Sequence, residues 1–113
     1  GIEHAKEVYR AWVPMHRDMP RTERFGIGST IDFFFLETFE ILRRATYATG
    51  KAKIDLLQGA IENIDSLRFF AQLAWELSLI TNTRYSTLGE GIENIGKMVG
   101  GWRKGLLTKT PAP

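Results

Sequence analysis

The sequence contains no cysteine among its 113 residues. This absence excludes a disulfide-stabilised scaffold, a thiol nucleophile, a cysteine-ligated zinc site and an iron–sulfur cluster. No apolar run approaches the ~18 residues that a membrane-spanning helix needs, and no leader pattern opens the chain. The length is that of one domain. Together these features predict a single cytoplasmic domain with no membrane partner.

Histidine is also scarce. His4 and His16 are the two present, and neither has a Glu three residues earlier, as the Glu-x-x-His motif of di-iron bundles requires. Residues 91–98 resemble a phosphate-binding loop, but Met98 replaces the magnesium-binding Ser or Thr and Glu93 would repel phosphate. No Ser–His–Asp arrangement is indicated. We therefore expect no metal, no cofactor and no catalytic residue, and interpret the chain as not being an enzyme.

Strand-like alternation is absent, whereas apolar residues recur at helical spacing almost everywhere. The clearest stripe runs from Tyr85 to Leu106 in steps of three and four residues. The pattern predicts helices over about 3–19, 23–48, 51–81 and 84–107, with Pro14 kinking or shortening the first. Short connections then predict an all-α, up-down-up-down four-helix bundle over residues 1–107, followed by a disordered tail, 108–113.

Local signals refine this expectation. Thr22 is the predicted cap of the second helix, and Thr83 or Thr87 that of the fourth. Gly89, Gly96 and Gly100 are predicted to allow the close approach of another backbone. The predicted core positions of the second helix are Ile31, Phe34 or Phe35, Thr38, Leu42 and Ala45.

Two helices carry more apolar residues than one buried stripe needs. Residues 33–36 are Phe-Phe-Phe-Leu and point in four directions around a helix, and residues 67–75 likewise surround the third helix. Either the surplus is buried on several sides of an uneven bundle or it forms an interface between copies. We favour a homo-oligomer with Phe33, Phe34 and Phe69 at its interface, since monomers rarely expose such patches.

The net charge is only +2, but the charge is unevenly distributed. Residues 97–109 sum to +4 and residues 54–76 to −3. Local spacing pairs Lys97 with Glu93. Arg17, Arg103 and Lys104 have no acid three or four residues away, as expected of cations that neutralise phosphates. Basic helix ends also complement the helix dipole, so both interpretations remain open.

Four segments carry a family resemblance: residues 10–12 (Arg-Ala-Trp), 19–25 (Met-Pro-Arg-Thr-Glu-Arg-Phe), 67–77 (Leu-Arg-Phe-Phe-Ala-Gln-Leu-Ala-Trp-Glu-Leu) and 95–102 (Ile-Gly-Lys-Met-Val-Gly-Gly-Trp). Because these four segments occur in this order and at this spacing, the chain resembles the accessory variability determinant (Avd) proteins of diversity-generating retroelements. These belong to a wider four-helix-bundle family that includes proteins encoded in 23S rRNA intervening sequences. The resemblance covers about residues 5–107.

The resemblance implies a homopentameric barrel of four-helix bundles with a basic surface. It also implies that the chain binds the retroelement reverse transcriptase and its RNA or cDNA during mutagenic retrohoming, without catalytic activity of its own. Alternatives are a bundle protein of the rRNA-intervening-sequence type, with no reverse transcriptase partner, and an oligomeric scaffold with protein partners alone.

Particular basic residues match basic positions of the family. Arg68 matches a charged position of the third helix, although Gln72 stands where a relative can carry Arg. Arg43 and Arg44 are candidates by charge alone. With Arg17 added from the spacing, the predicted nucleic-acid-binding residues are Arg17, Arg21, Arg24, Arg68, Lys97, Arg103 and Lys104.

Overall fold

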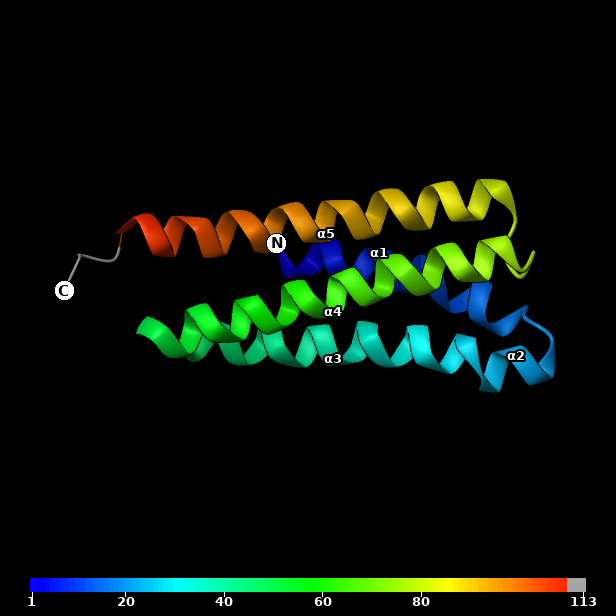
Figure 1. The fold of residues 1–113 in the computed structure, drawn as a ribbon, viewed down its shortest axis with the longest axis horizontal. Coiled ribbons are helices and arrows are strands. Elements are labelled where there is room, and N and C mark those ends of the chain that lie inside the picture. The colour runs from blue at the N-terminus through cyan, green and yellow to red at the C-terminus, as the bar shows by residue number, and fades with distance from the viewer. Residues whose placement is uncertain (110–113) are drawn as a thin grey trace.

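The computed structural model describes residues 1–109, which form helices and no strand (Figure 1). Four long helices alternate in direction: α1 (Ile2–Arg17), α3 (Ile27–Tyr47), α4 (Gly50–Glu76) and α5 (Asn82–Lys109). A short helix, α2 (Arg21–Phe25), precedes α3. The predicted all-α class is confirmed, and the arrangement is compatible with a four-helix bundle. The molecule measures 52 × 22 × 21 Å.

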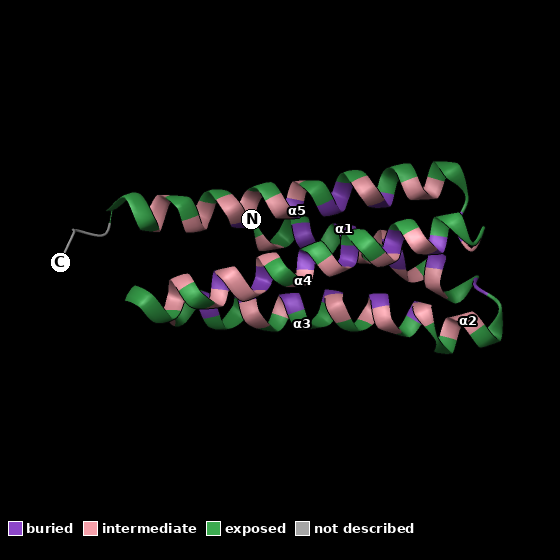
Figure 2. Ribbon diagram, viewed as in Figure 1, coloured by how far each residue is buried: buried purple, intermediate pink, exposed green. Residues whose placement is uncertain are grey.

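The core lies where the helices face one another (Figure 2). On α5 the predicted stripe is buried from Leu88 to Val99, and Tyr85 and Trp102 pack against its two ends. On α3 the buried aromatic residue is Phe35, while Phe34 is only partly buried. The other predicted core positions of α3, namely Ile31, Thr38, Leu42 and Ala45, are all buried.

The predicted second helix is divided at Gly26, where the backbone leaves the helical region (φ −96°, ψ −109°). Thr22, predicted as a cap, therefore lies inside α2. The next turn packs tightly, because a β-carbon at Gly28 would lie 2.6 Å from the His16 ring. The His16 ring also makes a 2.9 Å hydrogen bond with the Arg24 carbonyl, so His16 of α1 contacts both α2 and the first turn of α3.

The turn between α4 and α5 begins earlier than predicted, since α4 ends at Glu76 rather than near residue 81. Ser78 adopts a left-handed conformation (φ +60°), and the Leu79 N–H donates to the Ala74 carbonyl at 2.9 Å. This is the Schellman arrangement, which usually has Gly at the left-handed position and so escapes sequence recognition here.

The start of α5 also differs from the prediction. Thr81 caps the helix, because its hydroxyl accepts a hydrogen bond from the Arg84 N–H at 3.2 Å. The predicted caps Thr83 and Thr87 both lie inside α5, where the Thr87 hydroxyl donates to the Thr83 carbonyl. The cap prediction was wrong because it followed the apolar stripe, which begins one turn after the helix does.

α1 is short and is held to its neighbours at two places. The Asp32 carboxylate of α3 accepts hydrogen bonds from the Tyr9 hydroxyl at 2.8 Å and from the Trp12 indole N–H at 3.2 Å. On the other side, Gly91 of α5 admits the Val8 side chain, since a β-carbon at Gly91 would lie 2.7 Å from Val8 Cγ1. By contrast, a β-carbon at Gly89 or Gly100 would meet nothing within 4 Å, and one at Gly96 would meet only side-chain atoms, so none of the three brings another backbone close within the described residues.

Because α1 begins partway along the bundle, one end of the molecule consists of α3, α4 and α5 alone (Figure 1). Pro14 lies within α1, which ends three residues later, before the predicted residue 19. α5 continues through Thr108 and Lys109, which were expected in the disordered tail. The rest of that predicted tail, residues 110–113, lies outside the described residues. Over residues 1–109 no helix is long and apolar enough to cross a bilayer.

Candidate nucleic-acid interface

The basic residues gather at the end where α1 is missing. This region, the basic end, comprises the last part of α3, the first part of α4 and the last part of α5, which lie together in Figure 1. Its cations are Arg43, Arg44, Lys51, Lys53, Lys97, Arg103, Lys104 and Lys109. Four carboxylates lie along the same stretch of α3 and α4, namely Glu37, Glu40, Asp55 and Glu62, so the region carries a net charge of +4.

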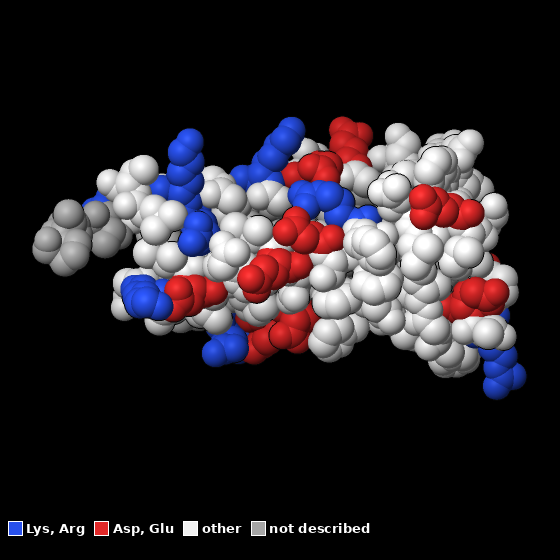
Figure 3. All heavy atoms as spheres, in the orientation of Figure 1, with Lys and Arg blue, Asp and Glu red and all other residues white. Residues whose placement is uncertain are grey.

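The rest of the chain carries the opposite sign. Since the whole sequence has a net charge of +2, the residues outside the basic end sum to −2. In Figure 3 the blue side chains cluster toward the end where α5 terminates, and most red ones lie along the middle and the other half. Charge is therefore separated along the long axis within one protomer, and strong positive charge does not depend on assembly.

Ion pairing inside the bundle leaves part of the basic end free. Lys97 loses its predicted partner, because Glu93 bonds to Arg68 across the α4–α5 contact. Arg44 has no ion pair within residues 1–109, because Glu40 holds Arg43 instead, with two hydrogen bonds of 2.8 and 2.9 Å. Lys97 and Lys104 are both exposed, and their spacing of seven residues places them on one face of α5.

Arg103 differs from the exposed cation that the spacing predicts. Its side chain is only partly exposed, and within the described residues its Nε is buried without a hydrogen-bond partner. The next residue, Trp102, lies under the Lys53 ammonium, 5.2 Å from the ring centroid. Sequence reasoning missed Lys51 and Lys53, which lie in the first turn of α4, nearly sixty residues before the end of α5.

Three of the predicted cations lie at the opposite end of the molecule. Arg17, Arg21 and Arg24, here called the junction cluster, surround the connection from α1 to α2. Arg24 donates a 3.4 Å hydrogen bond to the Arg17 carbonyl, and its guanidinium lies 5.8 Å from the Phe25 ring centroid. The structure does not bring these residues together with Lys97, Arg103 and Lys104.

Arg68 lies between the two clusters and is neutralised. It bonds to Asp65 on its own helix and to Glu93 on α5. The hydrogen bond to Glu93 raises the pKa of Arg68, partly opposed by desolvation of the guanidinium. Two carboxylates against one guanidinium leave no net positive charge, so Arg68 contributes to the contact of α4 with α5 rather than to a basic surface.

The exposed phenylalanines form a continuous group on α3 and α4. Phe34 stacks on Phe70 across the two helices, with centroids 5.9 Å apart, and Phe33 and Phe69 contact these rings edge to face. Phe33 is 56% and Phe69 65% exposed. These four residues are here called the aromatic patch. Of the predicted interface residues, Phe33 and Phe69 are exposed, whereas Phe34 is half-buried beneath them.

No group of histidine and carboxylate side chains that could hold a metal ion occurs within residues 1–109. No protein-family model matches the chain, and no curated protein matches it.

Proposed function

We propose that this chain is a non-catalytic, nucleic-acid-binding accessory protein, and that the basic end is its nucleic-acid contact. The supporting observation is the net charge of +4 on one end of a small domain, where Lys97 and Lys104 make no ion pair within residues 1–109. Phosphates neutralise such cations and release counterions, so binding weakens steeply as salt rises.

A double charge reversal, Lys97→Glu with Lys104→Glu, tests this proposal. Both side chains are exposed, so the bundle keeps its stability. Binding of a labelled single-stranded RNA, measured by fluorescence anisotropy, is expected to weaken. The slope of log K against log salt should become shallower by at least about 1.4, since each lost phosphate contact contributes about 0.7 for single strands.

The matched control reverses two cations of the junction cluster, Arg17→Glu with Arg21→Glu, which changes the net charge by the same amount. We expect this variant to bind RNA much more tightly than the basic-end variant. Equal losses in the two variants would mean that net charge alone governs binding. Unchanged binding in the basic-end variant would refute the proposed contact.

We further propose that copies of the chain associate through the aromatic patch. Phe33 and Phe69 leave more than half of their surface in water, and burial of apolar surface between copies would contribute about 25 cal/mol per Å². Replacing Phe33 and Phe69 with Ser should reduce the mass measured by light scattering while the helical signal stays unchanged. A wild-type chain that scatters as a single copy at high concentration would refute this part.

The resemblance in residues 5–107 supports a more specific role, as an accessory protein of a diversity-generating retroelement with a reverse transcriptase partner and a pentameric assembly. Co-purification of the chain with that polymerase, before and after nuclease treatment, tests the role. A polymerase gene and paired repeats beside the gene would agree with it, whereas an rRNA operon would favour the intervening-sequence type.

A second candidate is an oligomeric scaffold with protein partners alone. It is supported by the position of the aromatic patch, which lies on the half of the molecule with net negative charge. Retention of partners after nuclease treatment, without retention of the chain on an RNA column, would favour this candidate over the first.

A further inference from the structure

A groove runs between the first turns of α1 and the last two turns of α3. Six residues line it: Ile2, Lys6, Phe39, Arg43, Thr46 and Tyr47. The four that come from α3 repeat at helical spacing, so they form one face of that helix. The groove has a volume of about 370 Å³, at the small end of the ~300–1,000 Å³ range of ligand pockets.

The groove combines aromatic walls with a cationic rim. Phe39 is half-buried and packs edge to face on Tyr9, with centroids 5.7 Å apart, which holds its ring in place. Tyr47 is 83% exposed, the largest exposure among the large apolar side chains described. Lys6 comes from the opposite side, on α1, where its ammonium donates a 2.9 Å hydrogen bond to the exposed Glu3 carboxylate, so a phosphate at Lys6 would have to replace that carboxylate.

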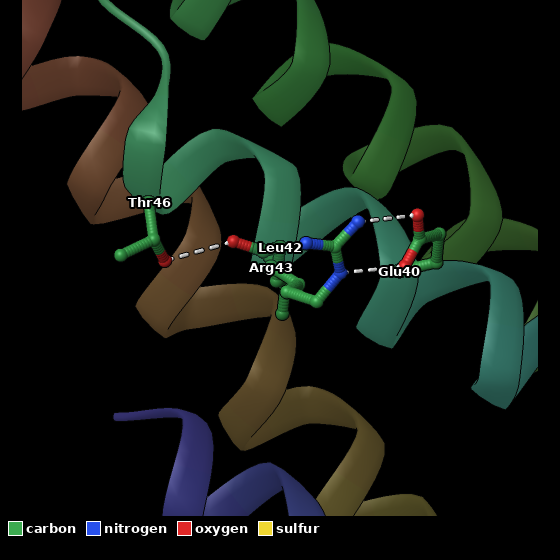
Figure 4. A network of polar contacts seen from close by, with 4 residues as sticks. All are labelled: Glu40, Leu42, Arg43 and Thr46. Carbon is green, nitrogen blue, oxygen red and sulfur yellow. Dashed lines mark hydrogen bonds and ion pairs between the residues drawn. The ribbon is translucent and has the colours of Figure 1, made fainter.

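Arg43 is oriented at this rim by its own helix. Its guanidinium donates two hydrogen bonds to the Glu40 carboxylate, while the Thr46 hydroxyl donates to the Leu42 carbonyl at 3.0 Å (Figure 4). The hydrogen bond with Glu40 raises the pKa of Arg43, and Tyr47 makes a smaller contribution in the same direction. The Arg43–Glu40 pair is exposed, and such pairs are weak enough to exchange a carboxylate for a phosphate.

We propose that this groove holds an unstacked base of a single-stranded nucleic acid, with the base against Tyr47 and Phe39 and the adjoining phosphate near Arg43 and Lys6. The inference rests on the proposed nucleic-acid-binding function and adds a preference for single strands. Proteins that bind single strands combine a cationic track with aromatic side chains on which bases stack. The net charge of +4 at this end makes a polyanion the complementary occupant.

The test is Tyr47→Ser, measured by fluorescence anisotropy with a labelled 12-nucleotide RNA, the same sequence as DNA, and the duplex of that DNA. Tyr47 is nearly fully exposed, so its loss leaves the core intact. Loss of one stacked base should weaken binding of both single strands about 5- to 150-fold. Duplex binding should change by less than about twofold, since paired bases are not available for stacking.

The matched control is Phe25→Ser, which removes another exposed aromatic residue beside an arginine, at the opposite end. Its binding should equal that of the original chain. An unlabelled glutamate oligomer of equal charge serves as a competitor without bases, and should displace the RNA poorly. Effective displacement of the RNA by the glutamate oligomer would show that the groove recognises negative charge alone or binds an acidic peptide. Either result would overturn the proposal.

Failure of this inference and failure of the proposed function give different results. Unchanged single-strand binding in Tyr47→Ser, with weakened binding in Lys97→Glu/Lys104→Glu, would refute the base-binding groove and retain the basic end. An equal loss of single-strand and duplex binding in Tyr47→Ser would also refute the groove. Wild-type binding in both variants would refute both proposals.

Discussion

Substitution of Gly91 by Ala should push α1 slightly away from α5. The new methyl group would lie 2.7 and 2.9 Å from the two γ-carbons of Val8, whereas carbon atoms normally approach to about 3.5–4.0 Å. Val8 is buried and β-branched, so its side chain has little freedom to turn away. The strain must therefore move α1 outward by most of an ångström.

The magnitude follows from two opposing effects. Overpacking of this kind costs about 1–3 kcal/mol. Replacing Gly with Ala inside a helix raises the intrinsic stability of that helix by about 1 kcal/mol. Gly91→Ala should thus lower the free energy of unfolding by about 0–2 kcal/mol. Gly89→Ala has the same intrinsic gain, and its β-carbon meets nothing within 4 Å, so it should stabilise the protein by about 1 kcal/mol.

The two variants lie two residues apart on one helix, and comparing them removes the intrinsic contribution. Urea denaturation followed by far-ultraviolet circular dichroism, at one protein concentration, should give a difference of about 1–3 kcal/mol. Val8→Ala removes the clashing carbons and should relieve part of the cost in the Gly91→Ala background. If Gly91→Ala is as stable as Gly89→Ala, the described approach of α1 to α5 is refuted.

Two further outcomes concern the polar contact that holds α1. Asp32→Ala removes the acceptor of the indole N–H of Trp12, whose side chain is fully buried. This variant should lower the free energy of unfolding, measured by thermal or urea denaturation, by about 1–3 kcal/mol. Asp32→Asn keeps an acceptor and should lower it by less. Burial, together with the hydrogen bond to Asp32, raises the pKa of Tyr9 to about 12. The folded state therefore holds this proton more tightly, so the stability is fully present below pH 10 and is lost as the pH rises toward 12. Tyr9→Phe should remove that part of the pH dependence in urea titrations at pH 8 to 11.5, and parallel curves for the two proteins would contradict the assignment.

The helices were predictable because each long helix buries a regular apolar stripe, and the stripe of α5 was located almost residue by residue. The boundaries were not, because they depend on contacts that spacing does not encode. Thr81 caps α5 before its stripe begins, and Ser78 adopts a conformation usually taken by Gly. The division of the predicted second helix at Gly26 depends on contacts of Arg24 and Gly28 with the His16 ring of α1.

The candidate interface was predictable only in part, for a different reason. Charge sums along the chain identified the basic end of α5, but Lys51 and Lys53 are remote in sequence and join it only because α4 starts beside the point where α5 ends. Spacing within one helix paired Glu93 with Lys97, while the structure pairs it with Arg68 on another helix. Contacts between helices thus decided which cations remain free.

The excess of positive charge at one end of a 52 Å molecule gives each protomer an electric dipole along its long axis. The electric field of a polyanion would exert a torque on this dipole and rotate the protomer before contact. The end without α1 would then reach the polyanion first, with the aromatic patch pointing away. At physiological ionic strength this torque acts over a Debye length of only about 8 Å, and at 0.01 M salt over about 30 Å. Salt should therefore slow the association rate as well as weaken the final complex.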